Sequence, residues 1–388
     1  TYKYWSSPVG KTETALNNYQ YAVKDIMFDG SEPINFLTSS YDGAPTSPIG
    51  IADYWIWKYA NEPSVNYSAW QHIRRTGIIN AGEGYTMKGP GSGTVEDEQN
   101  YVFLGKPNNG DINLSISTEN EYLVGNPYAS ALDANKFITD NNSLTSGPTP
   151  TITGTLYFWR HWAGESHFAN GYQGGYATYN LSGGVAAASF GTNNPFIATD
   201  GTPTKIPKRY IPVGEGFFVV GKTGGTIKFN NSQRVFKKET QVLVPVPNTD
   251  ILNSSEHFFN SSDTDHRMKF RIGFKSVNTM HRQLLLTIDE NATDGIDWAY
   301  DAEVNENQID DMYWSIDGKA FIIQASDNIQ STATYPLGVK TSADGVNKIS
   351  IEALEHVPNT LNVFLHDKTL DVYHNLKSGD YEIFVNRD

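Results

Sequence analysis

The sequence predicts an all-β protein with a duplicated β-rich N-terminal region, a C-terminal antiparallel β-sandwich and a few short helices. Aromatic residues make up 13% of the 388 residues and charged residues only 19%, which is too aromatic and too weakly charged for a disordered chain. Short runs of strand-forming residues are separated by turns rich in Gly, Asn and Pro. A Gly-Glu-Gly bend followed by an aromatic residue occurs twice, at 82–85 and at 214–217.

Each bend belongs to a longer series of landmarks, and the two series run in the same order. A small-polar turn containing Pro comes first, followed by an aromatic strand, the Gly-Glu-Gly bend and an Asn-Asn turn. The matched residues are Pro8 and Pro127, Gly82 and Gly214, and Asn108 and Asn230, which are 119, 132 and 122 positions apart. This order predicts a divergent duplication of roughly 120 residues. We assign the copies to residues 1–120 and 121–240, within one surface module spanning 1–240.

Two local patterns predict elements within the copies. The segment Asn108-Asn109-Gly110-Asp111 predicts a hairpin turn between strands at 101–104 and 112–116, because Asn-Gly accepts the positive φ of the favoured turns. In the second copy we expect a short helix near 130–139, with Ser130 capping its start. Its expected buried residues are Leu132, Phe137 and Ile138.

The composition changes between 233 and 265, where a Val- and Pro-containing segment leads into a stretch rich in Ser, Asn and Asp. We place the boundary and linker here, and assign residues 241–388 to a β-sandwich module. Its expected strands alternate apolar and polar residues at short spacing, as in a sandwich. They lie at 268–274, 283–288, 320–324, 348–351, 361–365 and 381–385.

Charge and cysteine usage argue against several classes of protein. There are 29 Lys and Arg against 43 Asp and Glu, for a net charge of −14, which argues against a nucleic-acid partner. The lack of Cys excludes disulfide scaffolds and cysteine metal sites. No apolar run approaches the roughly 20 residues of a membrane span, so no membrane insertion is expected. Because Thr1 is not an initiator Met, we expect a mature product or an excised piece.

Several blocks resemble a module of large secreted surface proteins from Bacteroidetes-type bacteria. These blocks lie at 4–9, 105–110, 123–128 and 214–219. The last module resembles the β-sandwich that precedes the type IX secretion sorting domain, in blocks at 292–297, 336–338 and 363–367. The resemblance implies export by the type IX secretion system to the extracellular space or outer cell surface, with a sorting domain expected after Asp388. It implies an adhesin-like or enzyme-linked role without defining an activity.

The sequence carries no recognisable catalytic motif. Neither a His-Glu-x-x-His spacing nor a Gly-x-Ser-x-Gly nucleophile motif occurs. Glu83 and Glu215 form a repeated pair of carboxylates, but glycosidase pairs are defined by their separation in space. A duplicated structural bend accounts for both residues. We therefore expect no catalytic residues and no enzymatic activity.

Aromatic side chains are the candidate ligand-binding residues, because flat rings with a polar edge suit the faces of sugars. We assign Trp55, Trp162 and Tyr172 to such a platform. The alternative is that these rings pack in the core and across strands. For Trp57 and Trp159 the packing role is favoured, whereas for Trp162 both interpretations stay open.

One acidic turn is a candidate calcium site. Asp294, Asp297 and Asp301 place three carboxylates within eight residues, and calcium prefers several oxygen ligands on flexible loops. The spacing does not match the EF-hand loop. Turn formation and solubility explain the same residues without a metal.

The predicted function is that of a non-enzymatic, exported cell-surface protein, either an adhesin or a structural module. Its expected partners are extracellular glycans or proteins of the cell surface and secretion system. The alternative is the carbohydrate-binding portion of a secreted polysaccharide-degrading enzyme. Absence of glycan binding would exclude the alternative, whereas glycan hydrolysis by the purified chain would exclude the main prediction.

Overall fold

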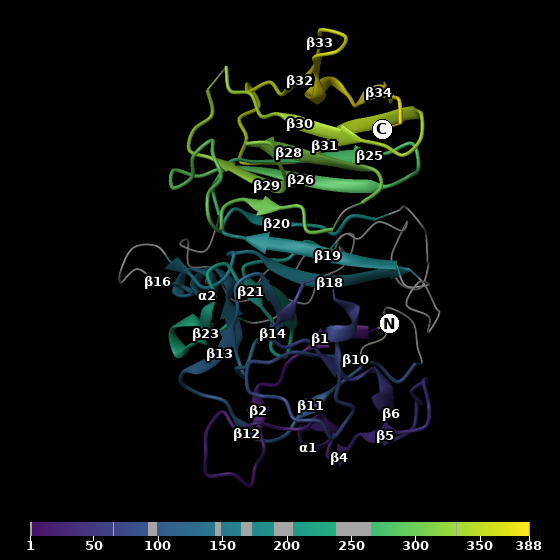
Figure 1. The fold of residues 1–388 in the computed structure, drawn as a ribbon, viewed down its shortest axis with the longest axis vertical. Helices are drawn as coiled ribbons and strands as arrows, with labels where there is room; N and C mark the ends of the chain where they lie inside the picture. The colour runs from purple at the N-terminus through teal and green to yellow at the C-terminus, as the bar shows by residue number, and fades with distance from the viewer. Residues whose placement is uncertain are drawn as a thin grey trace, which may run out of the picture.

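The computed structural model describes residues 2–64, 66–91, 99–143, 149–163, 173–189, 205–237, 265–306, 308–330 and 332–387 (Figure 1). Strands dominate these residues, which confirms the predicted all-β class. The described residues also include two short α-helices, α1 (Val23–Ile26) and α2 (Ala134–Asp140). Neither helix of this described part is long and apolar enough to cross a membrane. The predicted boundary near residue 240 lies outside the described residues and stays a prediction.

The N-terminal part consists of small sheets around a core that includes Tyr21, Ile26, Ile51 and Tyr85. Its strand pairs are β1 (Tyr2–Trp5) with β10 (Tyr85–Lys88), β2 (Val9–Gly10) with β12 (Lys106–Pro107), β5 (Asn35–Leu37) with β6 (Gly50–Ala52), and β7 (Trp57–Lys58) with β9 (Gln71–His72). A three-stranded sheet has the order β11 (Val102–Phe103), β3 (Met27–Asp29), β4 (Glu32–Pro33). The short length of these strands follows from the many turns in this half of the sequence.

A six-stranded sheet forms the middle of the molecule. Its order is β20 (Gly183–Val185), β19 (Gln173–Asn180), β18 (Leu156–Ala163), β22 (Gly216–Val220), β14 (Asn120–Gly125), β8 (Glu62–Pro63). Side chains of this sheet share one core with helix α2 and with the ribbon of β13 (Ile112–Ile116) and β23 (Gly225–Phe229). Smaller sheets join β15 (Ala131–Asp133) to β21 (Tyr210–Ile211) and β24 (Arg234–Val235), and β16 (Asn142–Ser143) to β17 (Thr149–Pro150).

Helix α2 forms where the sequence predicts it but begins later. Its N-cap is Asp133 rather than Ser130, and the Asp133 carboxylate accepts the Asn135 N–H at 3.1 Å. Arg209 Nη2 lies 2.7 Å from the same carboxylate. The predicted buried residues Leu132, Phe137 and Ile138 are all fully buried. Single 3-10 turns lie at Asp53–Trp55, Tyr67–Ala69, Asn231–Gln233 and Leu376–Ser378.

The hairpin predicted around the Asn108–Asn109 turn is wrong. Strand β11 pairs with β3, and β13 pairs with β23, so the segments at 101–104 and 112–116 are not partners. In β13 the side chains of Ile112, Leu114 and Ile116 are buried in the core shared with β23. Burial of this apolar face therefore selects the distant partner over the local turn.

The C-terminal part is one large curled sheet around its own core. Its order is β30 (Leu337–Lys340), β28 (Asp311–Ile316), β29 (Lys319–Ser326), β26 (His281–Ile288), β25 (Lys269–Lys275), β31 (Gly345–Glu355), β34 (Tyr381–Val385), with β27 (Ala302–Glu303) also paired to β29. All pairs are antiparallel except β26 with β29. A separate ribbon joins β32 (Phe364–Asp367) and β33 (Val372–Asn375). Curling around one core is consistent with the predicted sandwich-type architecture.

Residues 181–189 lie between the middle sheet and the C-terminal sheet, and Figure 1 shows β20 beside β26. Val185 and Ala188 belong to the C-terminal core. Arg271 Nη1 donates to the Gly184 carbonyl at 2.7 Å, and further bonds cross the same junction. The two parts therefore share a packed interface.

The two Gly-Glu-Gly bends lead into strand pairs that have the same register. The pairs Tyr2–Lys88 and Trp5–Tyr85 of β1 and β10 correspond to Glu121–Val220 and Val124–Phe217 of β14 and β22. Adding 119 to the residue numbers of β1 and 132 to those of β10 gives the residue pairs of β14 and β22. The Asn-Asn landmark departs from this pattern, because β12 precedes Asn108 whereas β24 follows Asn231–Gln233. The matched registers support the predicted duplication, which itself stays a prediction.

Candidate functional site

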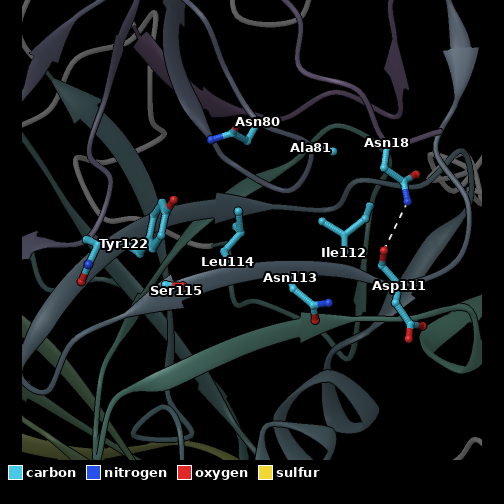
Figure 2. Close-up of a pocket in the computed structure, with 10 residues that line it drawn as sticks. Asn18, Asn80, Ala81, Asp111, Ile112, Asn113, Leu114, Ser115 and Tyr122 are labelled. Carbon is cyan, nitrogen blue, oxygen red and sulfur yellow. Dashed lines mark hydrogen bonds between the residues drawn. The ribbon is translucent and has the colours of Figure 1, made fainter. Parts of the chain in front are cut away.

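A polar cavity of about 530 Å³ opens between β13, β14 and neighbouring loops (Figure 2). Strands β13 and β14 follow one another in the chain but belong to different sheets. In Figure 2 the bend at Asn80 and Ala81 lies across the cavity from β13. The lining residues are Asn18, Asn61, Asn80, Ala81, Asp111, Ile112, Asn113, Leu114, Ser115 and Tyr122.

One edge of β13 carries main-chain groups that its sheet does not use. In β23 the Lys228 N–H donates to the Asn141 side chain at 2.8 Å and the Lys228 C=O accepts from that amide at 3.1 Å, so both point away from β13. In an antiparallel pair, two opposing residues direct their main-chain groups either toward each other or both away. Asn113 lies opposite Lys228, and Ser115 opposite Thr226 two positions along. The N–H and C=O groups of Asn113 and Ser115 therefore point to the free edge, beside the cavity.

Two Asn side chains add polar atoms to this cavity. Asn61 Oδ1 accepts from the Ser117 N–H at 2.7 Å and from Asn120 Nδ2 at 3.0 Å. Asn80 Nδ2 donates to Glu83 Oε1 at 3.1 Å. Within the described residues, Asn61 Nδ2 thus keeps donors available and Asn80 Oδ1 keeps an acceptor available.

The Glu83 carboxylate is held by four donors next to the cavity. Oε1 accepts from the Tyr122 hydroxyl at 2.7 Å and from Asn80 Nδ2 at 3.1 Å. Oε2 accepts from the Asn80 N–H at 2.8 Å and from Lys58 Nζ at 3.0 Å. Burial, together with the Glu83 charge, raises the pKa of the Tyr122 phenol well above its usual range. Both carboxylate oxygens of Glu83 are therefore occupied, and Lys58 balances its charge.

Of the three residues assigned to a sugar-stacking platform, Trp55 lies within the described residues. Its Nε1 donates to the Tyr41 carbonyl at 2.7 Å, and Lys88 Nζ lies 3.6 Å from the centroid of its ring. Trp162 belongs to β18, but its side chain and the whole of Tyr172 lie outside the described part. Trp55 does not line the cavity. The platform stays a prediction.

Trp57 and Trp159 pack against other rings, the role that the sequence favours for both. The Trp57 ring stacks on His72, with centroids 4.0 Å apart and planes 12° apart. The Trp159 ring lies 5.4 Å from the ring of Tyr176 at 70°. These contacts place the two Trp residues in separate aromatic clusters.

The three Asp residues of the acidic turn accept hydrogen bonds from the chain itself. Asp297 accepts the Thr293 N–H at 2.6 Å, and Asp301 accepts the N–H groups of Asp297 at 2.6 Å and Ala325 at 2.8 Å. Asp294 accepts from a serine hydroxyl of β29 at 2.7 Å. Burial raises the pKa of Asp301 to about 7. Across the described ranges, no group of three or more His, Cys, Asp or Glu side chains is arranged to hold a metal ion.

Calcium binding by Asp294, Asp297 and Asp301 stays a prediction. An ion that binds only the folded form at about tenfold excess over its Kd would stabilise the fold by roughly 1–2 kcal/mol. Thermal unfolding of the whole chain in calcium and in chelator measures this shift. Asp297→Ala should remove the shift, and an unchanged midpoint in the unmodified chain would leave a turn stabilised by its own backbone.

The sequence alone does not identify the cavity residues. Asn is common in turns throughout this chain, so composition alone does not single out Asn18, Asn61 or Asn80. The alternation of apolar and polar residues in β13 is visible in the sequence. Which edge of β13 is free depends on β23, more than a hundred positions later, and no local pattern shows that pairing.

The fold and the cavity define an all-β protein with a polar pocket between two of its sheets. A family described as a domain of unknown function (DUF8693) matches residues 37–387, and the chain belongs to this family. No curated protein matches the chain, and no solved structure matches it. The matched range includes both the N-terminal and the C-terminal parts.

Proposed function

We propose that this chain is a non-enzymatic, exported cell-surface module that binds a neutral glycan in the cavity beside β13. The observation that carries the proposal is the free edge of β13, where Asn113 and Ser115 direct their N–H and C=O groups beside a cavity of about 530 Å³. A cavity of this size is within the range of small-ligand sites in proteins.

The polar groups of the cavity match the chemistry of sugar hydroxyls. A hydroxyl both donates and accepts hydrogen bonds, and the strand edge offers both kinds of partner. Asn61 Nδ2 adds a donor and Asn80 Oδ1 an acceptor from the facing loops. Ile112 and Leu114 also line the cavity, but their side chains are almost fully buried in the core, so the polar groups carry the recognition.

The charges around the cavity favour a neutral ligand. Lys58 balances Glu83, and Asp111 at the cavity lining would repel an anion. The occupied oxygens of Glu83 also support binding without hydrolysis, because a general acid or base needs an oxygen free to exchange a proton with the substrate.

A proline substitution tests the strand edge directly. Ser115→Pro removes the N–H that points to the cavity but leaves the hydrogen bonds between β13 and β23, since an edge strand tolerates Pro on its unpaired side. Ser115→Ala is the matched control, because it keeps that N–H. An array of neutral oligosaccharides, followed by titration with the strongest binder, provides the readout.

We expect the unmodified chain and Ser115→Ala to bind with similar affinity and Ser115→Pro to bind about tenfold or more weakly. Circular dichroism and thermal unfolding establish that each variant is folded. No binding to any neutral glycan, or equal binding by Ser115→Pro, would refute the assigned cavity. Hydrolysis of a bound glycan would refute the non-enzymatic role.

A further inference from the structure

The two Gly-Glu-Gly bends are tied to each other's first strand by reciprocal main-chain contacts. The Ser6 N–H donates to the Gly214 carbonyl at 2.8 Å, and the Gly125 N–H donates to the Gly82 carbonyl at 3.0 Å. Bridges of the same kind join Trp5 to Glu215 and Val124 to Glu83. Each contact maps onto its counterpart by the shifts of 119 and 132 positions that relate the strand registers. Positions around one bend therefore have counterparts around the other.

The residues around Glu215 differ in chemistry from those around Glu83. The same shifts place Lys3 at the position of Tyr122 and Pro212 at the position of Asn80. Each Glu pairs with a basic residue that follows a Trp on an adjacent strand. These pairs are Lys58 with Glu83 and Arg160 with Glu215.

Glu215 is held by fewer donors than Glu83. Its Oε1 accepts long bonds from Arg160 Nη1 at 3.3 Å and Nη2 at 3.4 Å, and its Oε2 accepts none from the described residues. Pro212 has no N–H to replace the Asn80 donor. Arg160 Nε is buried and donates to no acceptor in the described part. The Arg160 side chain as a whole is 24% exposed and its Nη1 and Nη2 bonds to Glu215 are long, so these N–H groups keep hydrogen-bonding capacity for an added anion.

Among the described residues that act electrostatically on Lys3, positive charge exceeds negative charge. The side chain of Lys3 is exposed, yet partial desolvation lowers its pKa, the charges of Lys205 and Arg160 lower it further and Glu215 raises it, so these four charges act on one another. Within this set of four described groups, three cations and one carboxylate give an excess of two positive charges, in a chain whose net charge is −14. Mutual repulsion among these cations would be relieved by a bound anion.

We propose that Lys3, Arg160, Lys205 and Glu215 form a second site that binds the carboxylate of an acidic sugar. The inference rests on the proposed function, because it takes the ligand to be a glycan. Arg160 supplies planar N–H donors suited to a carboxylate, and the two Lys residues supply further charge. Glu215 holds the Arg160 guanidinium in place from one side.

Calorimetric titration of the whole chain with a short oligogalacturonate and with its methyl ester tests this site. The two probes share the same rings and hydroxyls and differ in their charged carboxylates. We expect the acid to bind at low ionic strength, and the ester to bind about tenfold or more weakly. Arg160→Ala should weaken acid binding by a similar factor. Lys208→Ala, at an exposed lysine outside the site, should leave it unchanged.

Two further measurements keep the result interpretable. If Arg160→Ala does not fold, Lys3→Ala at an exposed side chain replaces it and should also weaken acid binding. Ser115→Pro should leave acid binding unchanged, which separates this site from the neutral-glycan cavity. Equal affinity for acid and ester, or full acid binding by a folded Arg160→Ala variant, would overturn the proposal.

Discussion

The bends that contain Glu83 and Glu215 share one main-chain arrangement but carry different chemistry. The same register, the same reciprocal hydrogen bonds and the same pairing of Glu with a basic residue occur at both. Yet the Glu83 side chain is only 3% exposed and fully hydrogen-bonded, whereas the Glu215 side chain is 24% exposed and holds a single partner. The glycines and the strand pairing thus define the main-chain arrangement of both bends. The neighbouring side chains determine whether each Glu is structural or available to a ligand site.

The largest expected difference concerns removal of the two carboxylates. Glu83→Ala leaves Lys58 without its partner in a mostly buried position, and we expect a loss of about 3–5 kcal/mol in the free energy of unfolding. Glu215→Ala removes a more exposed pair with long hydrogen bonds, and should cost about 0–1 kcal/mol. Denaturant unfolding measures both values. Equal losses at the two positions would remove the distinction between a structural and an available carboxylate.

The strands that follow the bends also differ, since buried Lys88 in β10 corresponds to Val220 in β22. Burial lowers the pKa of Lys88 from 10.5 to about 8. Between these values the unfolded chain holds a proton that the folded chain lacks, so stability should rise with pH by up to about 1.4 kcal/mol per pH unit.

Lys88→Val places the second copy's residue in the first and should remove this contribution. Unfolding of both chains at several pH values from 8 to 10 provides the measurement, and the difference between them isolates Lys88 from tyrosines that titrate higher. A difference that does not change with pH would mean that Lys88 is not perturbed in the folded chain.

A smaller loss of stability, of equal size at the two bends, is expected when the first glycine of each bend is replaced. Gly82 has φ +86° and Gly214 has φ +76°, a conformation that L-residues adopt at a cost. Gly82→Ala and Gly214→Ala should each destabilise the chain by about 1–2 kcal/mol. Thermal unfolding of the two variants tests the shared main-chain arrangement, and a large effect at only one of them would weaken the proposed duplication.

Much of this main-chain arrangement is predictable from local sequence. Repetition of Gly-Glu-Gly, strand-forming runs and the helix around Phe137 all depend on residues close together in the chain. The ligand sites are different, because the cavity needs the pairing of β13 with distant β23, and the second site needs Lys3 beside Arg160. Such juxtapositions follow from tertiary packing. The wrong hairpin at Asn108 has the same cause, since burial of Ile112 and Leu114 outweighed the turn.

We propose that the two bends support two separate glycan sites, one that prefers a neutral ligand and one that prefers an acidic ligand. A titration of the whole chain with oligogalacturonate, with and without a saturating neutral oligosaccharide, tests this claim most directly. We predict that both ligands bind at once, that Arg160→Ala loses only the acid and that Ser115→Pro loses only the neutral sugar. Competition between the two ligands, or loss of both in either variant, would contradict the claim.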